Sequence, residues 1–202
     1  MYYGGTTVTC YNGQSNKTTT CPTNILDNTA KTLIDNHTWN TGAIDVTDTT
    51  IENQETFALN TVPFYKAERG NETGKICTGG NLCNDTVERT TTWTGYIGLP
   101  YVTDWAYASS ENDCNTKIDQ SSTYKCKNNN WMSKNIWYWT LSPRAFSGDS
   151  RSVWSVHSFG YVRYDFAAGG NAVFPTIYLK SNILIESGKG TSDNPYILKA
   201  GA

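Results

Sequence analysis

The sequence lacks the long apolar runs and the excess of one charge that mark several classes of protein. Its 202 residues hold no run of about 18 apolar residues, the minimum for a membrane-spanning helix. The first residues also lack signal-peptide character. Sixteen basic and eighteen acidic residues give a net charge of −2, with no basic stripe that would neutralise phosphates. We therefore expect neither membrane contact nor nucleic-acid binding.

Charged side chains of either sign are scarce as well. They make up 17% of the chain, against 38% hydrophobic and 13% aromatic residues, so hydroxyl and amide groups must provide solubility. A chain of this length buries roughly 70% of its unfolded surface, which is enough for one sizeable core. We expect a single domain over residues 1–202, with a polar region up to about residue 90 that holds one helix, and an aromatic-rich region over 91–202.

The cysteines are even in number and fall into neighbouring pairs along the chain. They are Cys10, Cys21, Cys77, Cys83, Cys114 and Cys126. Sequential pairing would close short polar loops that burial alone cannot hold, although the sequence does not select one pairing. A zinc site is the alternative, but no C-x-x-C spacing occurs and both histidines lie far from the cysteines in sequence. Disulfides are typical of secreted chains, so we expect an extracellular protein.

Residue patterns predict one helix in the polar region and several strands in the aromatic one. Apolar side chains recur at helical spacing over residues 24–36, whereas isolated aromatics over 37–75 indicate short strands or coil. Thr103 and Asp104 predict the cap of a short helical turn. Alternation around Gly160 predicts a β-hairpin with that glycine in the left-handed conformation. Further strands are predicted over residues 136–141, 173–179, 182–185 and 196–198.

Short motifs follow one another in an order that resembles a known family. They are WNTG (39–42), ERG (68–70), WTGYIGL (93–99), TDWAYA (103–108), WTLSP (139–143), VWSV (153–156), GYV (160–162), PTIYLKS (175–181) and GTSDNPY (190–196). The chain is similar to the extracellular parts of Gram-positive bacterial surface proteins with a type IV prepilin-like N-terminus. Phe159 and Phe174 stand where that family usually has Asp and Arg, and the hydrophobic prepilin helix is not in these residues.

The resemblance implies an α+β, C-type-lectin-like fold of mostly short antiparallel strands, one or two helices and long disulfide-clipped loops. It also implies a non-catalytic domain for adhesion or ligand recognition on the bacterial cell surface or a pilus. The partner would be an unidentified glycan or protein, or pilus subunits. Two alternatives stay open: a structural type IV pilin-like subunit whose surface serves filament assembly, and an enzyme of the formylglycine-generating branch of that fold.

Few residues offer catalysis or metal binding. Asp104 is expected to cap a helix, and His157 lies near serines without a partner acid, as a catalytic triad would require. Calcium takes about six to eight oxygen ligands, more than Asp149 or the pair at 193–194 can supply. We therefore expect no catalytic residue, no metal and no cofactor.

Aromatic and arginine side chains of the C-terminal half are the candidate binding residues, because Tyr, Trp and Arg dominate binding hot spots. Trp139 and Trp154 are expected to anchor the core instead. The arginines are expected to be exposed, since arginine is almost never buried unpaired, and so is Tyr164. The register of the hairpin does not follow from the sequence. The predicted ligand-binding residues are Arg144, Asp149, Arg151, His157, Arg163 and Tyr164.

Overall fold

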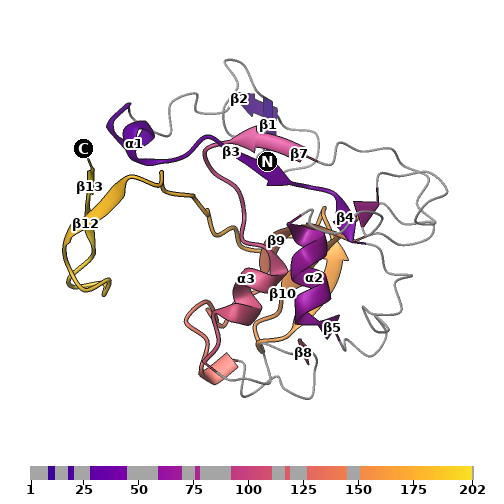
Figure 1. The fold of residues 1–202 in the computed structure, drawn as a ribbon. Coiled ribbons are helices and arrows are strands. Elements are labelled where there is room, and N and C mark those ends of the chain that lie inside the picture. Colours follow the sequence, from indigo (N-terminus) through magenta and orange to yellow (C-terminus); the bar gives the residue numbers. More distant parts are fainter. Residues whose placement is uncertain are drawn as a thin grey trace. The chain divides into compact units, whose positions relative to one another are not determined.

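The computed structural model describes residues 9–11, 18–20, 28–44, 59–69, 76–77, 92–110, 117–118, 127–144 and 151–201. Contacts divide the chain into two compact units, whose elements are labelled in Figure 1. The first unit comprises residues 1–38, 94–98 and 176–202, and the second comprises 39–93 and 99–175. The single domain over residues 1–202 stays a prediction.

A three-stranded antiparallel sheet lies at the centre of the second unit. In the order β11-β10-β9, it joins β9 (Tyr138–Pro143), β10 (Ser152–Val156) and β11 (Val162–Phe166). Trp154 pairs with Tyr164, and Ser155 pairs with Arg163. Directly opposite residues share a face, so Trp154 and Tyr164 occupy one face, while Ser155 and Arg163 occupy the other, here called the outer face.

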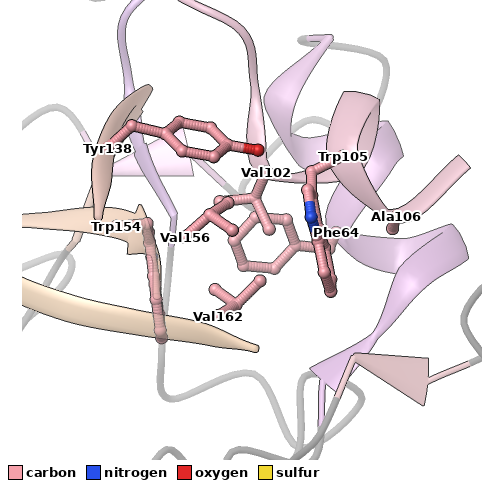
Figure 2. Packing of buried hydrophobic residues seen from close by; sticks show 8 residues of the cluster. All are labelled: Phe64, Val102, Trp105, Ala106, Tyr138, Trp154, Val156 and Val162. Atoms are coloured by element: carbon pink, nitrogen blue, oxygen red, sulfur yellow. The ribbon is translucent and has the colours of Figure 1, made fainter. Parts of the chain in front are cut away.

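The face that carries Trp154 forms the core of this unit. Trp154 and Val162 point from the sheet into a cluster that Phe64 and Trp105 complete, as Figure 2 shows. Phe64 belongs to α2 (Thr61–Glu68) and Trp105 to α3 (Val102–Tyr107). Burial of each large apolar side chain contributes about 1.5–3 kcal/mol. The predicted core role of Trp154 is confirmed.

The turn between β10 and β11 is the predicted hairpin. His157 donates its N–H to the carbonyl of Tyr161 at 2.8 Å, and Gly160 donates to the carbonyl of His157 at 2.8 Å. The φ angle of Gly160 is 78°, in the left-handed region that favours glycine. The hairpin prediction is confirmed, and the burial of Trp154 fixes the register that the sequence left open.

Trp139 lies on the outer face, opposite Ser155, and is half-buried. It is not part of the core cluster, so its predicted role as a core anchor is wrong. Its N–H donates to the carbonyl of Ala172 at 3.0 Å, and the N–H of Ala172 donates to the carbonyl of Trp137 at 2.9 Å. Ala172 thereby forms a parallel bridge with Tyr138 along the edge of β9.

The helices of the second unit had different signals in the sequence. The N-cap of α3 is Tyr101 and not Thr103 or Asp104 as predicted, but Asp104, in the first turn, accepts the N–H of Tyr101 at 2.8 Å and so takes part in the cap. The pattern around Phe64 predicted strand or coil, whereas α2 forms there because Phe64 packs edge to face against Trp154 at 5.8 Å.

None of the helices in the described part has the length and apolar character of a bilayer span. The strand pairs β4 (Ala43–Ile44) with β6 (Ile76–Cys77), and β5 (Leu59–Asn60) with β8 (Lys117–Ile118), also belong to the second unit.

The first unit consists of short strand pairs and one helix. Its elements are β1 (Thr9–Tyr11) with β2 (Thr18–Thr20), α1 (Asn28–Leu33), and β12 (Ile183–Ser187) with β13 (Ile197–Ala200). The strands β3 (His37–Asn40) and β7 (Thr92–Gly95) also pair, and the residues of each are divided between the two units. The helix predicted over residues 24–36 is only six residues long, and residues 24–27 lie outside the described part. The last two predicted strands are present, but residues 173–179 form only isolated bridges, such as Thr176 with Gly98.

The predicted α+β, C-type-lectin-like fold is wrong. The described strands form one three-stranded sheet and five two-stranded sheets, mostly antiparallel, and the described helices have six to eight residues. Short Thr- and Asn-rich segments lack a sustained alternation of apolar side chains, so they pair locally and do not extend a larger sheet. The side chains of all six cysteines lie outside the described residues, and their disulfides stay a prediction.

Candidate functional site

The predicted ligand-binding residues do not gather at one place. The register puts Arg163 on the outer face of the sheet and Tyr164 on the core face, opposite Trp154. Asp149 lies outside the described residues. Successive residues of a strand point to opposite faces, so neighbours in the sequence of β11 cannot serve one surface.

Two of the predicted arginines cover aromatic rings of the core-side face. Arg144 is only 4% exposed, and its Cζ lies 3.5 Å from the centre of the Tyr164 ring. The predicted exposure of Arg144 is therefore wrong, because the guanidinium packs on this ring. Arg151 is exposed as predicted, with its Cζ 4.9 Å from the Phe166 ring. Both contacts are cation–π interactions that stabilise the fold.

His157 lies in the middle of an aromatic cluster at the hairpin. Its ring stacks on Tyr161 at 4.3 Å and 14°, and lies 3.9 Å from Trp137 and 5.0 Å from Phe159, measured between ring centres. The Nδ1 atom accepts the N–H of Phe159 at 3.0 Å, which requires Nδ1 to be unprotonated. Burial, and then the nearby charge of Arg163, hold the pKa of His157 below its usual range. The imidazole is thus neutral at pH 7.

A cation flanks this cluster at each end. The Cζ of Arg163 lies 5.6 Å from the Trp137 ring, and the Nζ of Lys127 lies 5.7 Å from the Phe159 ring. Phe159 is 58% exposed and Arg163 is exposed, whereas His157 is buried. The side chains of Lys127, Trp137 and Tyr161 are half-buried. We call this set the aromatic row: Lys127, Trp137, His157, Phe159, Tyr161 and Arg163. Exposed Phe159, with half-buried rings beside it, gives this part of the surface an apolar element of the kind found at interaction sites.

Gly160 lets the hairpin turn pack directly against Lys127. A Cβ atom built on Gly160 would lie 2.4 Å from the Cβ and 2.9 Å from the Cα of Lys127. The glycine also holds a positive φ, which other residues adopt at a cost. Gly160 therefore allows Lys127, one of the two flanking cations, to lie against the hairpin turn.

Gly160→Ala is expected to lower the free energy of unfolding by about 1–3 kcal/mol through backbone strain, with an added steric cost. Urea denaturation measures this loss. Gly170→Ala is the control, because nothing lies within 4 Å of a Cβ at Gly170. Equal stability of the two variants would show that the turn does not need its glycine.

A second cluster of polar side chains surrounds Glu68, which is 1% exposed. One carboxylate oxygen accepts the N–H of Val102 at 2.9 Å and the hydroxyl of Ser142, and the other accepts the N–H of Thr103 at 3.1 Å and the hydroxyl of the same residue. Burial raises the pKa of Glu68 to about 7, although the two hydroxyls and Arg69 oppose the shift. Every donor comes from the fold itself, so this carboxylate joins α2 to α3 and β9.

Arg69, the next residue, continues this network toward the surface. Its guanidinium forms an ion pair with Asp104 and lies 4.1 Å from the Tyr101 ring. Asp104 meanwhile caps α3. The acidic side chains of this cluster therefore have structural partners, and their arrangement offers no free carboxylate for acid–base chemistry.

The geometry around His157 does not assemble a hydrolase triad either. Ser158 Oγ lies 3.3 Å from Nδ1, while Ser155 Oγ donates to the carbonyl of Arg163 at 3.2 Å. In the part of the chain that the structure describes, no group of three or more His, Cys, Asp or Glu side chains has the arrangement of a metal site.

Sequence reasoning missed most of the aromatic row. Of its members, the prediction named only His157 and Arg163. The predicted hairpin was the available signal, since His157 and Tyr161 lie opposite each other across its turn and Arg163 follows Tyr161 by two residues. Lys127 comes from a distant segment, and no local pattern predicts its contact with Phe159.

Comparison with family models, with curated proteins and with solved structures finds no match to this chain.

Proposed function

We propose that this protein is an extracellular domain of the bacterial surface, or of a pilus, that recognises a ligand through the aromatic row and has no catalytic role. The observation that carries the proposal is the row itself, in which exposed Phe159 lies among half-buried rings with a cation at each end. Trp, Tyr and Arg dominate binding hot spots because they bury large areas and keep a polar group, and the row contains Trp137, Tyr161 and Arg163.

The extracellular compartment is supported by the even number of cysteines and by the resemblance of the motifs to Gram-positive surface proteins. A surface that only packs against sister subunits would equally be rich in aromatic side chains. The two roles differ in what they bind, because a subunit surface recognises copies of its own chain and an adhesive surface recognises a foreign ligand.

Phe159→Ser is expected to weaken ligand binding at least about tenfold, because it removes the most exposed ring of the row. Glycan and protein arrays are probed with the wild type, and each hit is then titrated with the variant. Stability should change by less than about 1 kcal/mol, since the ring is largely exposed.

The matched control is Leu184→Ser, on β12 of the first unit, because Leu184 is 52% exposed and Phe159 is 58% exposed. Hits that survive Phe159→Ser and vanish in Leu184→Ser would place the binding site elsewhere. Concentration-dependent self-association that Phe159→Ser abolishes, without any array hit, would instead favour the pilin-like subunit.

A further inference from the structure

The cations of the aromatic row are Arg163 and Lys127, which lie against Trp137 and Phe159. In the described part of the chain, no carboxylate lies within ion-pairing distance of Arg163 or Lys127. The nearest acid by register is Asp165, two residues along the same face of β11. Asp165 accepts the N–H of Phe166 at 2.8 Å, and its other oxygen lies 3.5 Å from a Cβ built on Gly169.

Among the described residues, the row therefore carries two unpaired cations on a chain whose net charge is −2. His157 adds no charge at pH 7, because its Nδ1 accepts a hydrogen bond from the backbone of Phe159. A neutral imidazole packed between rings instead fixes the orientation of Phe159 and Tyr161. Charge complementarity thus favours an acidic ligand over a neutral or basic one.

The rings supply the second half of the recognition. Phe159 offers an exposed aromatic surface, and Trp137 and Tyr161 are half-buried beside it, in contact with the same imidazole. Flat aromatic surfaces pack well against the C–H faces of a ring and retain polar edges. A ligand with a flat, partly apolar ring and a carboxylate on its rim would satisfy both the rings and the cations.

Resting on the proposed function, we propose that the aromatic row binds carboxylated sugar residues of an acidic glycan, with successive sugar rings along the row from Phe159 and a carboxylate on Arg163 at the other end. The guanidinium has a planar fork of donors that matches a carboxylate with two parallel hydrogen bonds. No hydrogen bond from this guanidinium occurs among the described residues, so its donors are available. Lys127 provides the second point of charge, at the other end of the row.

The small number of cations argues for a carboxylated sugar over a nucleic acid. Nucleic-acid affinity rises with the number of phosphates that are neutralised, and proteins that bind this way use many lysines and arginines. The row offers one arginine and one lysine on aromatic rings. This arrangement suits one or two separate acid groups on a chain of ring-shaped units.

The test is a titration of the protein with oligosaccharides of uronic acids and of sialic acid, each paired with its methyl ester. Calorimetry is expected to show that at least one acid binds about tenfold tighter than its ester, the difference that charge-assisted hydrogen bonds provide. Arg163→Gln should remove this preference and leave the weaker binding of the ester. Arg151→Gln is the matched control, since Arg151 is also exposed and also covers a ring, but on Phe166.

Each other outcome overturns the inference in a distinguishable way. If acid and ester bind with equal affinity and Phe159→Ser abolishes this binding, the proposed function stands but the carboxylate is not recognised. An acid preference that Arg163→Gln and Lys127→Gln both preserve would place the acid group elsewhere. Binding to nucleic acids or proteins, without binding to any glycan, would refute a glycan as the ligand. An absence of binding to every array and oligosaccharide would overturn both this inference and the proposed function.

Discussion

Trp154→Ala is expected to lower the free energy of unfolding of the second unit by about 3–5 kcal/mol. The indole is fully buried, and its ring meets Phe64 at 5.8 Å and Tyr164 at 6.1 Å, both edge to face. Truncation would leave a cavity between the sheet and α2 that neighbours held by the sheet cannot fill. Urea or thermal denaturation followed by tryptophan fluorescence and circular dichroism measures the loss.

Two further variants make this expectation specific. Trp154→Phe should cost far less than the alanine change, because a ring remains and the Nε1 atom that is removed has no hydrogen-bond partner in the described structure. Trp131→Ala makes the same truncation at a side chain that is 74% exposed, so it should change stability little. Similar losses at Trp154 and Trp131 would contradict the packing of this core.

Glu68→Gln is expected to remove a strong dependence of stability on pH. Burial raises the pKa of Glu68 from 4.5 to about 7, so the folded protein holds a proton that the unfolded chain releases. The corresponding stabilisation is fully present below pH 4.5 and is lost as the pH rises to about 7. The loss amounts to about 3 kcal/mol. Denaturation of wild type and variant across this range measures the difference between the two profiles.

The difference profile isolates Glu68 from the other groups that titrate. His157, whose pKa is lowered, makes the wild-type protein more stable as the pH rises, but it is present in both proteins and cancels. Asp104 and Arg69, which face the carboxyl, are likewise unchanged. Glu186→Gln is the control, because that carboxyl is half exposed beside Lys199. A Glu68→Gln profile that runs parallel to the wild type would rule out the raised pKa.

Local features of the fold were predictable from the sequence because their causes are local. Gly160 has a positive φ in the turn that joins β10 to β11, and Asp104 accepts the N–H of the N-cap residue three positions before it. The formation of α2 depends instead on Phe64 meeting Trp154, which is distant in sequence. Glu68 reaches Ser142 across 74 residues, and no local pattern encodes such a partner.

The resemblance of ordered motifs failed for the fold for a related reason. Motifs such as residues 139–143 and 153–156 do occur as strands β9 and β10, but their order does not specify how other strands join them. Pairing depends on cross-strand side chains and burial, and polar segments leave it weakly determined. The described strands accordingly form small separate sheets and not the implied lectin-like fold.

For the site, general rules on residue types failed where a specific contact overrode them. Arginine is usually exposed, yet Arg144 is buried because the Tyr164 ring lies 3.5 Å from its Cζ. The two predicted residues that do meet, His157 and Arg163, share the row because Trp137 of the neighbouring segment lies against both. Burial of Trp154 determined which face became the outer one, and sequence alternation alone could not.

The bridge at Ala172 has a consequence for how copies of this protein meet. An unpaired sheet edge is a template on which a strand from another molecule can assemble. At β9, the N–H of Trp139 and the carbonyl of Trp137 are already used by Ala172. A second copy can add a strand at this position only by displacing Ala172. The bridge therefore protects this edge of β9 from aggregation through strand addition.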